Sequence, residues 1–151
     1  MIFETYEAAE TYRLGEQIGR QAIAGQIYTL VGDLGTGKTV FSQGVGAGLL
    51  VKEPINSPTF TIVQEYDSGR LPFYHFDVYR IGDIEEMEEI GYDDYFFGEG
   101  VCLIEWADLI KEILPAEAIN ITIEKDLSGC KSDYRKITID GINEIEGMET
   151  L

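Results

Sequence analysis

The sequence has few cysteines and a single histidine, and both shortages exclude classes of protein. Cys102 and Cys130 could form one disulfide at most, and no Cys-x-x-Cys or Cys/His cluster is present to bind zinc. Cys102 stands in an apolar run and is expected to be a small buried hydrophobe. His75 has no second histidine with which to complete a metal site, so we interpret it as structural.

Basic residues are the most marked deficit. Against 11 Lys and Arg stand 28 Asp and Glu, a formal net charge of −17. Nucleic-acid affinity comes largely from Lys and Arg that displace phosphate counterions, so direct high-affinity binding of nucleic acid is not expected. Between Arg80 and Lys111 the chain has ten acidic residues and no basic one. Such a run is usually a solvated face, and a docking surface for a basic partner is the alternative.

Long apolar runs are also missing. No stretch of about 18 consecutive apolar residues occurs, so neither a membrane span nor a membrane partner is expected. The first ten residues lack the basic and apolar regions of a secretory signal. The 151 residues suffice for one compact domain and not for two. We therefore expect a reduced, soluble, cytoplasmic protein with one domain over 1–141 and a tail at 142–151, which has little periodicity and is expected to fray.

Apolar periodicity and turn signals predict strands that alternate with helices. Helices are expected over 6–24 (with Thr5 as N-cap and Gly25 as the stop), over 40–50, from an Asp83/Glu86 capping box to Gly91, and after Glu105 as far as Leu114. Strands are expected over 26–31, 61–66, 71–76, 101–104, 120–124 and 135–140, with a hairpin turn at 67–70. This order predicts an α/β domain: a mixed sheet with a parallel core, antiparallel members, and helices on both faces.

The strongest local motif lies between the first predicted strand and the next helix. Its sequence, GDLGTGKT, fits the phosphate-binding pattern G-x-x-x-x-G-K-[ST] without a gap, and the residues expected to bind nucleotide are Gly32, Asp33, Leu34, Gly35, Thr36, Gly37, Lys38 and Thr39. The glycines let successive N–H groups point inward at phosphate oxygens, and the helix N-terminus faces the same anion. Lys38 should reach the β- and γ-phosphates of ATP, and Thr39 should offer its hydroxyl to Mg²⁺. Because strand and helix flank the motif as it requires, a P-loop NTPase-like fold is favoured over a chance glycine loop.

A phosphate loop also needs an acid for the metal and a group that orients the attacking water. Asp77 ends a predicted hairpin strand, and Glu105 ends a predicted buried strand at the edge where open α/β sheets place ligands. An acid at that position could equally be the solvated exit of its strand. Thr59 follows Ser57 and Pro58 in a loop that could bring a hydroxyl to the γ-phosphate, although these three residues alone are typical of a turn.

Four segments together resemble one known family. They are GDLGTGKT at 32–39, SPTF at 57–60, HFDVYR at 75–80 and IEW at 104–106. In combination they are similar to the TsaE (YjeE) family of bacterial P-loop ATPases, with a match from about residue 7 to 115. The resemblance implies a role in making N6-threonylcarbamoyladenosine in tRNA, binding of ATP with Mg²⁺, and association with the proteins TsaD and TsaB, of which TsaD performs the transfer.

The resemblance also implies roles for single residues. Lys38 and Thr39 keep the roles given above, Glu105 is a metal-linked acid, and Asp77 aligns the hydrolytic water. Which of the two acids touches Mg²⁺ directly is left open.

Further residues carry over at the margins of the site. Thr59 would contact the γ-phosphate in the manner of a switch, and Thr11 would lie near the base of the nucleotide. Trp106 and Arg80 would line the site. Since the chain itself should repel tRNA, the resulting hypothesis is a cycle in which ATP binding and hydrolysis drive docking on the transferase and release from it.

Three other functions are weighed against this ATPase. A small-molecule kinase of the P-loop type would line its phosphoryl path with several arginines, whereas the five arginines here are scattered. A nucleotide-gated binding module with negligible turnover cannot be separated from a slow ATPase by sequence. A GTPase is disfavoured because no Asn-Lys-x-Asp run occurs.

Overall fold

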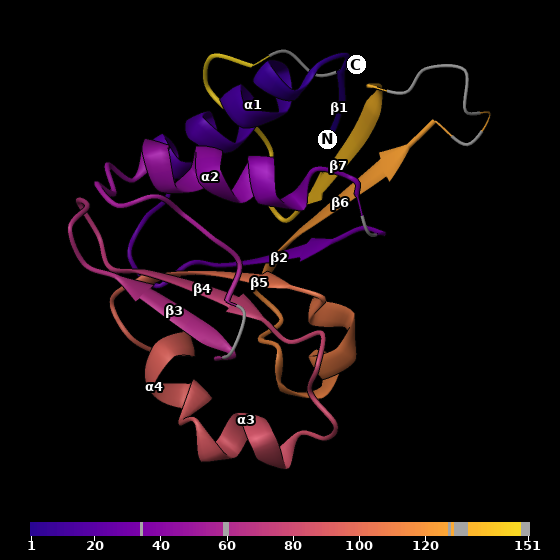
Figure 1. Cartoon of the computed structure of the whole chain (residues 1–151). Helices are drawn as coiled ribbons and strands as arrows, with labels where there is room; N and C mark the ends of the chain where they lie inside the picture. Colours follow the sequence, from indigo (N-terminus) through magenta and orange to yellow (C-terminus); the bar gives the residue numbers. More distant parts are fainter. Residues whose placement is uncertain (34, 59–60, 127, 129–132, 149–151) are drawn as a thin grey trace.

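The structure is a computed structural model that describes residues 1–33, 35–58, 61–126, 128 and 133–148 (Figure 1). The strands are β1 (Ile2–Thr5), β2 (Ile27–Val31), β3 (Val63–Tyr66), β4 (Phe73–Asp77), β5 (Val101–Glu105), β6 (Ile119–Lys125) and β7 (Arg135–Asp140). The helices are α1 (Ala8–Gln21), α2 (Lys38–Gly48), α3 (Glu85–Glu89), α4 (Tyr92–Phe96) and the 3₁₀ helix η1 (Ala107–Ile113).

One mixed sheet contains all of these strands, in the order β1-β7-β6-β2-β5-β4-β3. Its centre is parallel, because β2 pairs in parallel with both β5 and β6, and β4 pairs in parallel with β5. The edges are antiparallel: β7 and β1 follow β6 on one side, and β3 follows β4 on the other. This confirms the predicted α/β class with a parallel core. The β4–β5 register sets Asp77 directly beside Glu105.

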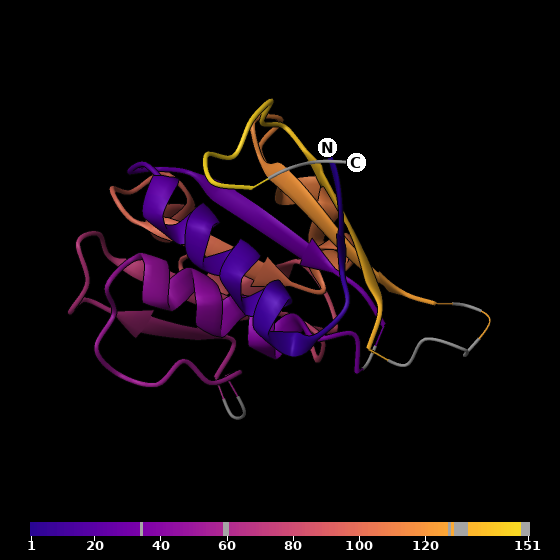
Figure 2. The ribbon, with the colours of Figure 1, turned by 90° about the horizontal axis from the view of Figure 1, so that it is seen from above.

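Helices cover both faces of the sheet, as the sequence predicts. Helices α1 and α2 lie side by side over one face, and α3, α4 and η1 lie over the other (Figures 1 and 2). Each face has its own apolar cluster. Cys102 is buried in the second cluster as predicted, and burial raises the pKa of its thiol to about 12. None of the described helices has the length and apolar character that crossing a bilayer requires.

Helices α1 and α2 approach each other through glycines. A Cβ on any of four helical glycines would lie 2.1–2.4 Å from a backbone oxygen of the opposite helix; these are Gly15, Gly19, Gly44 and Gly48. Real Cβ contacts are essentially never shorter than 3.0 Å. Only glycine therefore permits this spacing, which holds α1 against the helix that begins at the phosphate loop.

The chain start differs from the prediction. Residues 2–5 form an edge strand beside β7, and Thr5 is part of it rather than an N-cap. The Thr5 hydroxyl instead lies 2.7 Å from the hydroxyl of Thr11. Helix α1 begins at Ala8 without a side-chain cap, and it ends at Gln21, before Gly25.

Smaller differences occur along the rest of the chain. The expected helix before Pro115 is the 3₁₀ helix η1, kinked at Ile110, and α4 was not predicted. The amide of Glu86 donates to Asp83 Oδ1, which is half of the expected capping box. In the described part of the tail, Ile145 is buried, whereas we expected this segment to fray. The side chain of Gln21 also exchanges hydrogen bonds with the backbone of Glu146.

Candidate nucleotide site

The predicted phosphate loop follows β2 and leads into α2. Gly35 and Gly37 have φ angles of 77° and 99°, in the left-handed region that favours glycine. Gly32 passes so close to β6 that a Cβ would lie 2.7 Å from the carbonyl oxygen of Ile123. The hydroxyl of Thr36 donates to the carbonyl of Asp33 at 2.8 Å and closes the turn. The loop therefore has the glycine-dependent conformation that the phosphate-binding pattern requires.

Lys38 is buried and folded back over the loop. Its Nζ donates to the carbonyl of Gly32 at 2.6 Å and lies 3.5 Å from the centroid of the Trp106 ring. Burial lowers the pKa of Lys38, and the nearby carboxylates of Glu105 and Asp77 partly oppose that shift. The ammonium is thus held by a carbonyl and an aromatic face, and an incoming phosphate would compete for it.

Arg135, at the start of β7, supports the loop from the opposite side. Its Nε donates to the carbonyl of Thr36 at 2.7 Å, and its Nη2 donates to the carbonyl of Gly35 at 3.3 Å. These two hydrogen bonds tie the phosphate loop to the start of β7. Arg135 also adds positive charge beside the loop on a strongly acidic chain.

The two predicted acids meet at the carboxyl ends of β4 and β5. Asp77 is half-buried, and burial raises the pKa of its carboxyl, while a hydrogen bond from the Tyr79 N–H at 3.0 Å opposes the shift. Glu105 is 3% exposed. Its Oε2 lies 2.6 Å from Nε2 of His75, which is also buried. Because one oxygen of Glu105 is engaged by His75, the other is the one that can serve a ligand.

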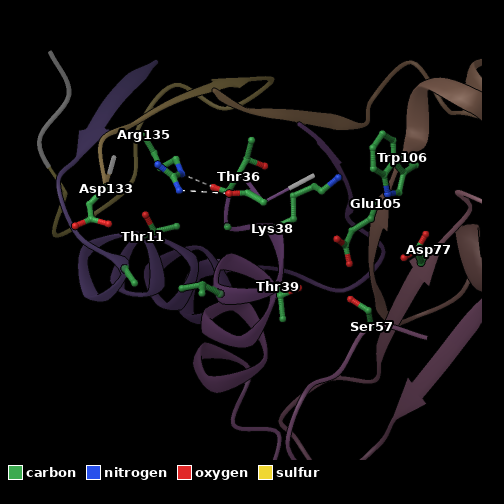
Figure 3. A pocket seen from close by; sticks show the side chains of 14 residues that line it. Thr11, Thr36, Lys38, Thr39, Ser57, Asp77, Glu105, Trp106, Asp133 and Arg135 are labelled. Carbon is green, nitrogen blue, oxygen red and sulfur yellow. Dashed lines mark hydrogen bonds between the residues drawn. The ribbon is translucent and has the colours of Figure 1, made fainter. Parts of the chain in front are cut away.

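A cavity of about 430 Å³ joins these groups (Figure 3). Its lining residues are Ala8, Thr11, Gly35, Thr36, Gly37, Lys38, Thr39, Val40, Ser57, Asp77, Glu105, Trp106, Asp133 and Arg135. Figure 3 shows Asp77, Glu105, Trp106 and Ser57 on one side, and Thr11, Asp133 and Arg135 on the other. The cavity thus has an acidic end beyond Lys38 and an end near α1 and β7, which suits an extended molecule with a phosphate tail.

Most residues predicted for the site line this cavity, and some do not. Gly32 and Asp33 line a neighbouring cavity on the far side of the loop. Arg80 is exposed and is not among the lining residues. Leu34 and Thr59 lie outside the described residues.

The oxygen donors at the acidic end suit magnesium. Mg²⁺ is usually bound by one or two carboxylates together with waters and substrate phosphates. Glu105 and Asp77 supply carboxylates, and the exposed Thr39 supplies a hydroxyl beside the loop. Within the described part of the chain no cluster of three or more His, Cys, Asp or Glu side chains could hold a metal. The residues present thus fit a metal that a bound phosphate helps to hold.

Comparison with known proteins identifies the family. A family model described as "Threonylcarbamoyl adenosine biosynthesis protein TsaE" matches residues 5–136. The chain belongs to the TsaE family. The "tRNA threonylcarbamoyladenosine biosynthesis protein TsaE" of Bacillus subtilis (strain 168) is 45% identical over 140 residues, which cover 93% of this chain and 85% of that protein. The protein of the same name from Treponema pallidum (strain Nichols) is 40% identical over 132 residues, which cover 87% and 94%.

A solved structure agrees with this assignment. The crystal structure of Bacillus subtilis YdiB matches with a TM-score of 0.74 and 40% identity, over 92% of this chain and 83% of that one. The predicted resemblance to the TsaE family is therefore confirmed. The segment matched by the TsaE model extends through Arg135, so it includes every residue that lines the cavity.

Sequence reasoning missed four polar residues of this TsaE-family site. Arg135 lies 99 positions from its partner Thr36, and no local pattern connects the two. Asp133 lines the cavity from a loop without a motif, and Ser57 belongs to the SPTF segment, in which Thr59 was the predicted contact. For His75 a signal existed: it stands two residues before Asp77 on one strand, so strand alternation places both side chains on the same face.

Proposed function

We propose that this protein binds Mg²⁺-ATP in the cavity and hydrolyses it as a component of the system that makes threonylcarbamoyladenosine in tRNA. One observation carries the proposal: a phosphate loop, its lysine and two carboxylates line the same cavity. The names of the relatives support the tRNA pathway, since those proteins are named for threonylcarbamoyladenosine biosynthesis.

Each group would have a distinct part in the reaction. The loop amides and the N-terminus of α2 would hold the β- and γ-phosphates. Lys38 would give up its hydrogen bond to the Gly32 carbonyl and donate to a phosphate oxygen instead. Thr39 and Glu105 would hold Mg²⁺, which neutralises charge on the phosphates when bound. Asp77 would orient the attacking water, and the raised pKa of its carboxyl would make the carboxylate a stronger base toward that water.

The proposed protein partners are TsaD and TsaB. The charge of the chain supports a partner of this kind, because a net charge of −17 repels tRNA and favours action on another protein. ATP binding would favour docking on the TsaD–TsaB complex, and hydrolysis would favour release.

Nucleotide binding is tested with Lys38→Ala. Loss of the ammonium removes a charge-assisted contact to phosphate, so ATP affinity measured by calorimetry should fall roughly 10- to 100-fold. Lys52→Ala is the matched control, because Lys52 is exposed and lies outside the cavity lining. Equal ATP affinity in the Lys38 variant and the wild type would refute the assigned role of the loop.

Hydrolysis and partner binding are tested together. Phosphate release is measured for the protein alone and with TsaD–TsaB, and co-purification with that complex is compared with and without ATP. We expect the complex to stimulate release, and ATP to alter co-purification. Binding without turnover under both conditions would instead support a nucleotide-gated binding module, and a phosphorylated small-molecule product would support a kinase.

A further inference from the structure

The buried pair of His75 and Glu105 adjoins the cavity without His75 lining it. His75 is 1% exposed, and its ring is stacked on Phe73 with ring centroids 6.1 Å apart. Its Nε2 lies 2.6 Å from Glu105 Oε2. Glu105 in turn lines the cavity beside Asp77. The imidazole therefore contacts the acidic end of the site only through Glu105.

The polar contacts of His75 are directed at Glu105. Among the described residues, Nδ1 of His75 is the one buried side-chain nitrogen or oxygen without a hydrogen-bond partner. A second N–H at Nδ1 would be buried with no acceptor, so the geometry favours a ring that carries its proton on Nε2 and donates it to the carboxylate. Packing against Phe73 alone would be served better by an apolar ring, since an unpaired buried nitrogen costs stability.

We propose that His75 is a positioning residue that fixes the Glu105 carboxylate through one oxygen and thereby orients the other toward the Mg²⁺-nucleotide. This inference rests on the proposed function. A carboxylate held at one oxygen loses rotational freedom. Its second oxygen is therefore oriented for the metal before the metal binds. Hydrogen-bond partners of metal ligands typically account for 10- to 100-fold in metal affinity or activity.

The test uses two replacements at position 75. His75→Leu removes the donor and keeps an apolar side chain of moderate size, whereas His75→Gln keeps an amide N–H that can reach the Glu105 carboxylate. Mg²⁺ affinity is measured by titrating the ADP-loaded protein and following the fluorescence of Trp106, the only tryptophan. We expect a 10- to 100-fold weaker Mg²⁺ affinity in His75→Leu and recovery of most of it in His75→Gln.

Kinetics separate positioning from nucleotide binding. Relative to the wild type with TsaD–TsaB, His75→Leu should lower kcat for ATP hydrolysis and leave the KM for ATP nearly unchanged, because the loop and Lys38 are intact. Wild-type Mg²⁺ affinity and kcat in a folded His75→Leu protein would overturn the inference. Loss without recovery in His75→Gln would also overturn it, since that result indicates a packing role.

A spectroscopic measurement on the protein needs no nucleotide. His75 is the only histidine, so in untagged protein its ring nitrogens are assigned in ¹⁵N NMR spectra without mutagenesis. We expect a proton on Nε2, a bare Nδ1, and a downfield N–H resonance that moves in Glu105→Gln. A proton on Nδ1 would overturn the inference whatever the ATPase assay shows. Failure of the wild type to bind or hydrolyse ATP would instead overturn the proposed function.

Discussion

Replacing Gly44 by alanine should force apart the two helices that lie over one face of the sheet. The added Cβ would lie 2.2 Å from the carbonyl oxygen of Tyr12 and 3.0 Å from the amide nitrogen of Glu16. Ordinary van der Waals contact begins at 3.4 Å, so α1 would have to retreat by about 1 Å. Both neighbours are backbone atoms, which no side-chain rotation can move aside.

The expected cost follows from two opposed effects. Overpacking a close-packed contact costs about 1–3 kcal/mol, and a rigid backbone neighbour places this site at the upper end. Alanine recovers about 1 kcal/mol through its higher helix propensity. The net loss is about 2 kcal/mol, which lowers the melting temperature of a domain of this size by roughly 4–8 °C.

Thermal melting followed by circular dichroism measures this loss. Gly46→Ala is the matched control on the same helix, because its Cβ would meet only the side chain of Ile55, which can change rotamer. The control should lose less than Gly44→Ala. Because Tyr12 adjoins Thr11 in the cavity lining, Gly44→Ala should also weaken ATP binding. A Gly44→Ala protein as stable as the wild type would refute the close helix contact.

Further predictions concern the cavity and the charge of the chain. Asp77→Asn should keep ATP binding and lose hydrolysis, as calorimetry and phosphate release would show. Burial raises the pKa of Asp77 above 3.8, so the folded chain holds this proton to a higher pH than the unfolded chain does. The folded protein therefore loses stability as the pH rises from about 3.8 through the raised pKa. Asp77→Asn should have a higher melting temperature than the wild type at neutral pH but not below pH 3.8. A difference in melting temperature that grew as the pH fell would contradict this expectation. Arg135→Gln should weaken ATP binding by releasing two loop carbonyls, while Lys136→Gln, on an exposed neighbour, should not. Bare tRNA should not be retarded by the protein in gels at physiological salt, and clear retardation would contradict the charge argument.

Local sequence patterns predicted the central part of the fold. The runs that became β2 and β5 are short, apolar and bounded by turn signals, so their burial could be expected from composition alone. The phosphate loop was recognisable because its chemistry requires glycines at fixed spacing. These features depend on neighbours in sequence, which is why they were predictable.

Features that depend on distant partners were not predictable. Residues 2–5 form a strand only because β7 offers an open edge more than a hundred positions later. The contact of Arg135 with Thr36 and that of His75 with Glu105 likewise join separate strands and loops. The sequence indicated that Glu105 could be either a ligand acid or a solvated strand end, and its burial against His75 rules out the second of these.

The indole of Trp106 links the phosphate loop to the outside of the molecule. One neighbour of this ring is the ammonium of Lys38, and another is the ring of Tyr79, 4.8 Å away between centroids and 54% exposed. A triphosphate that draws Lys38 toward itself would remove the ammonium from the indole. The indole would then be free to change its packing against the ring of Tyr79. Binding of ATP would thus change the exposed surface at Tyr79 through the contact between two aromatic rings.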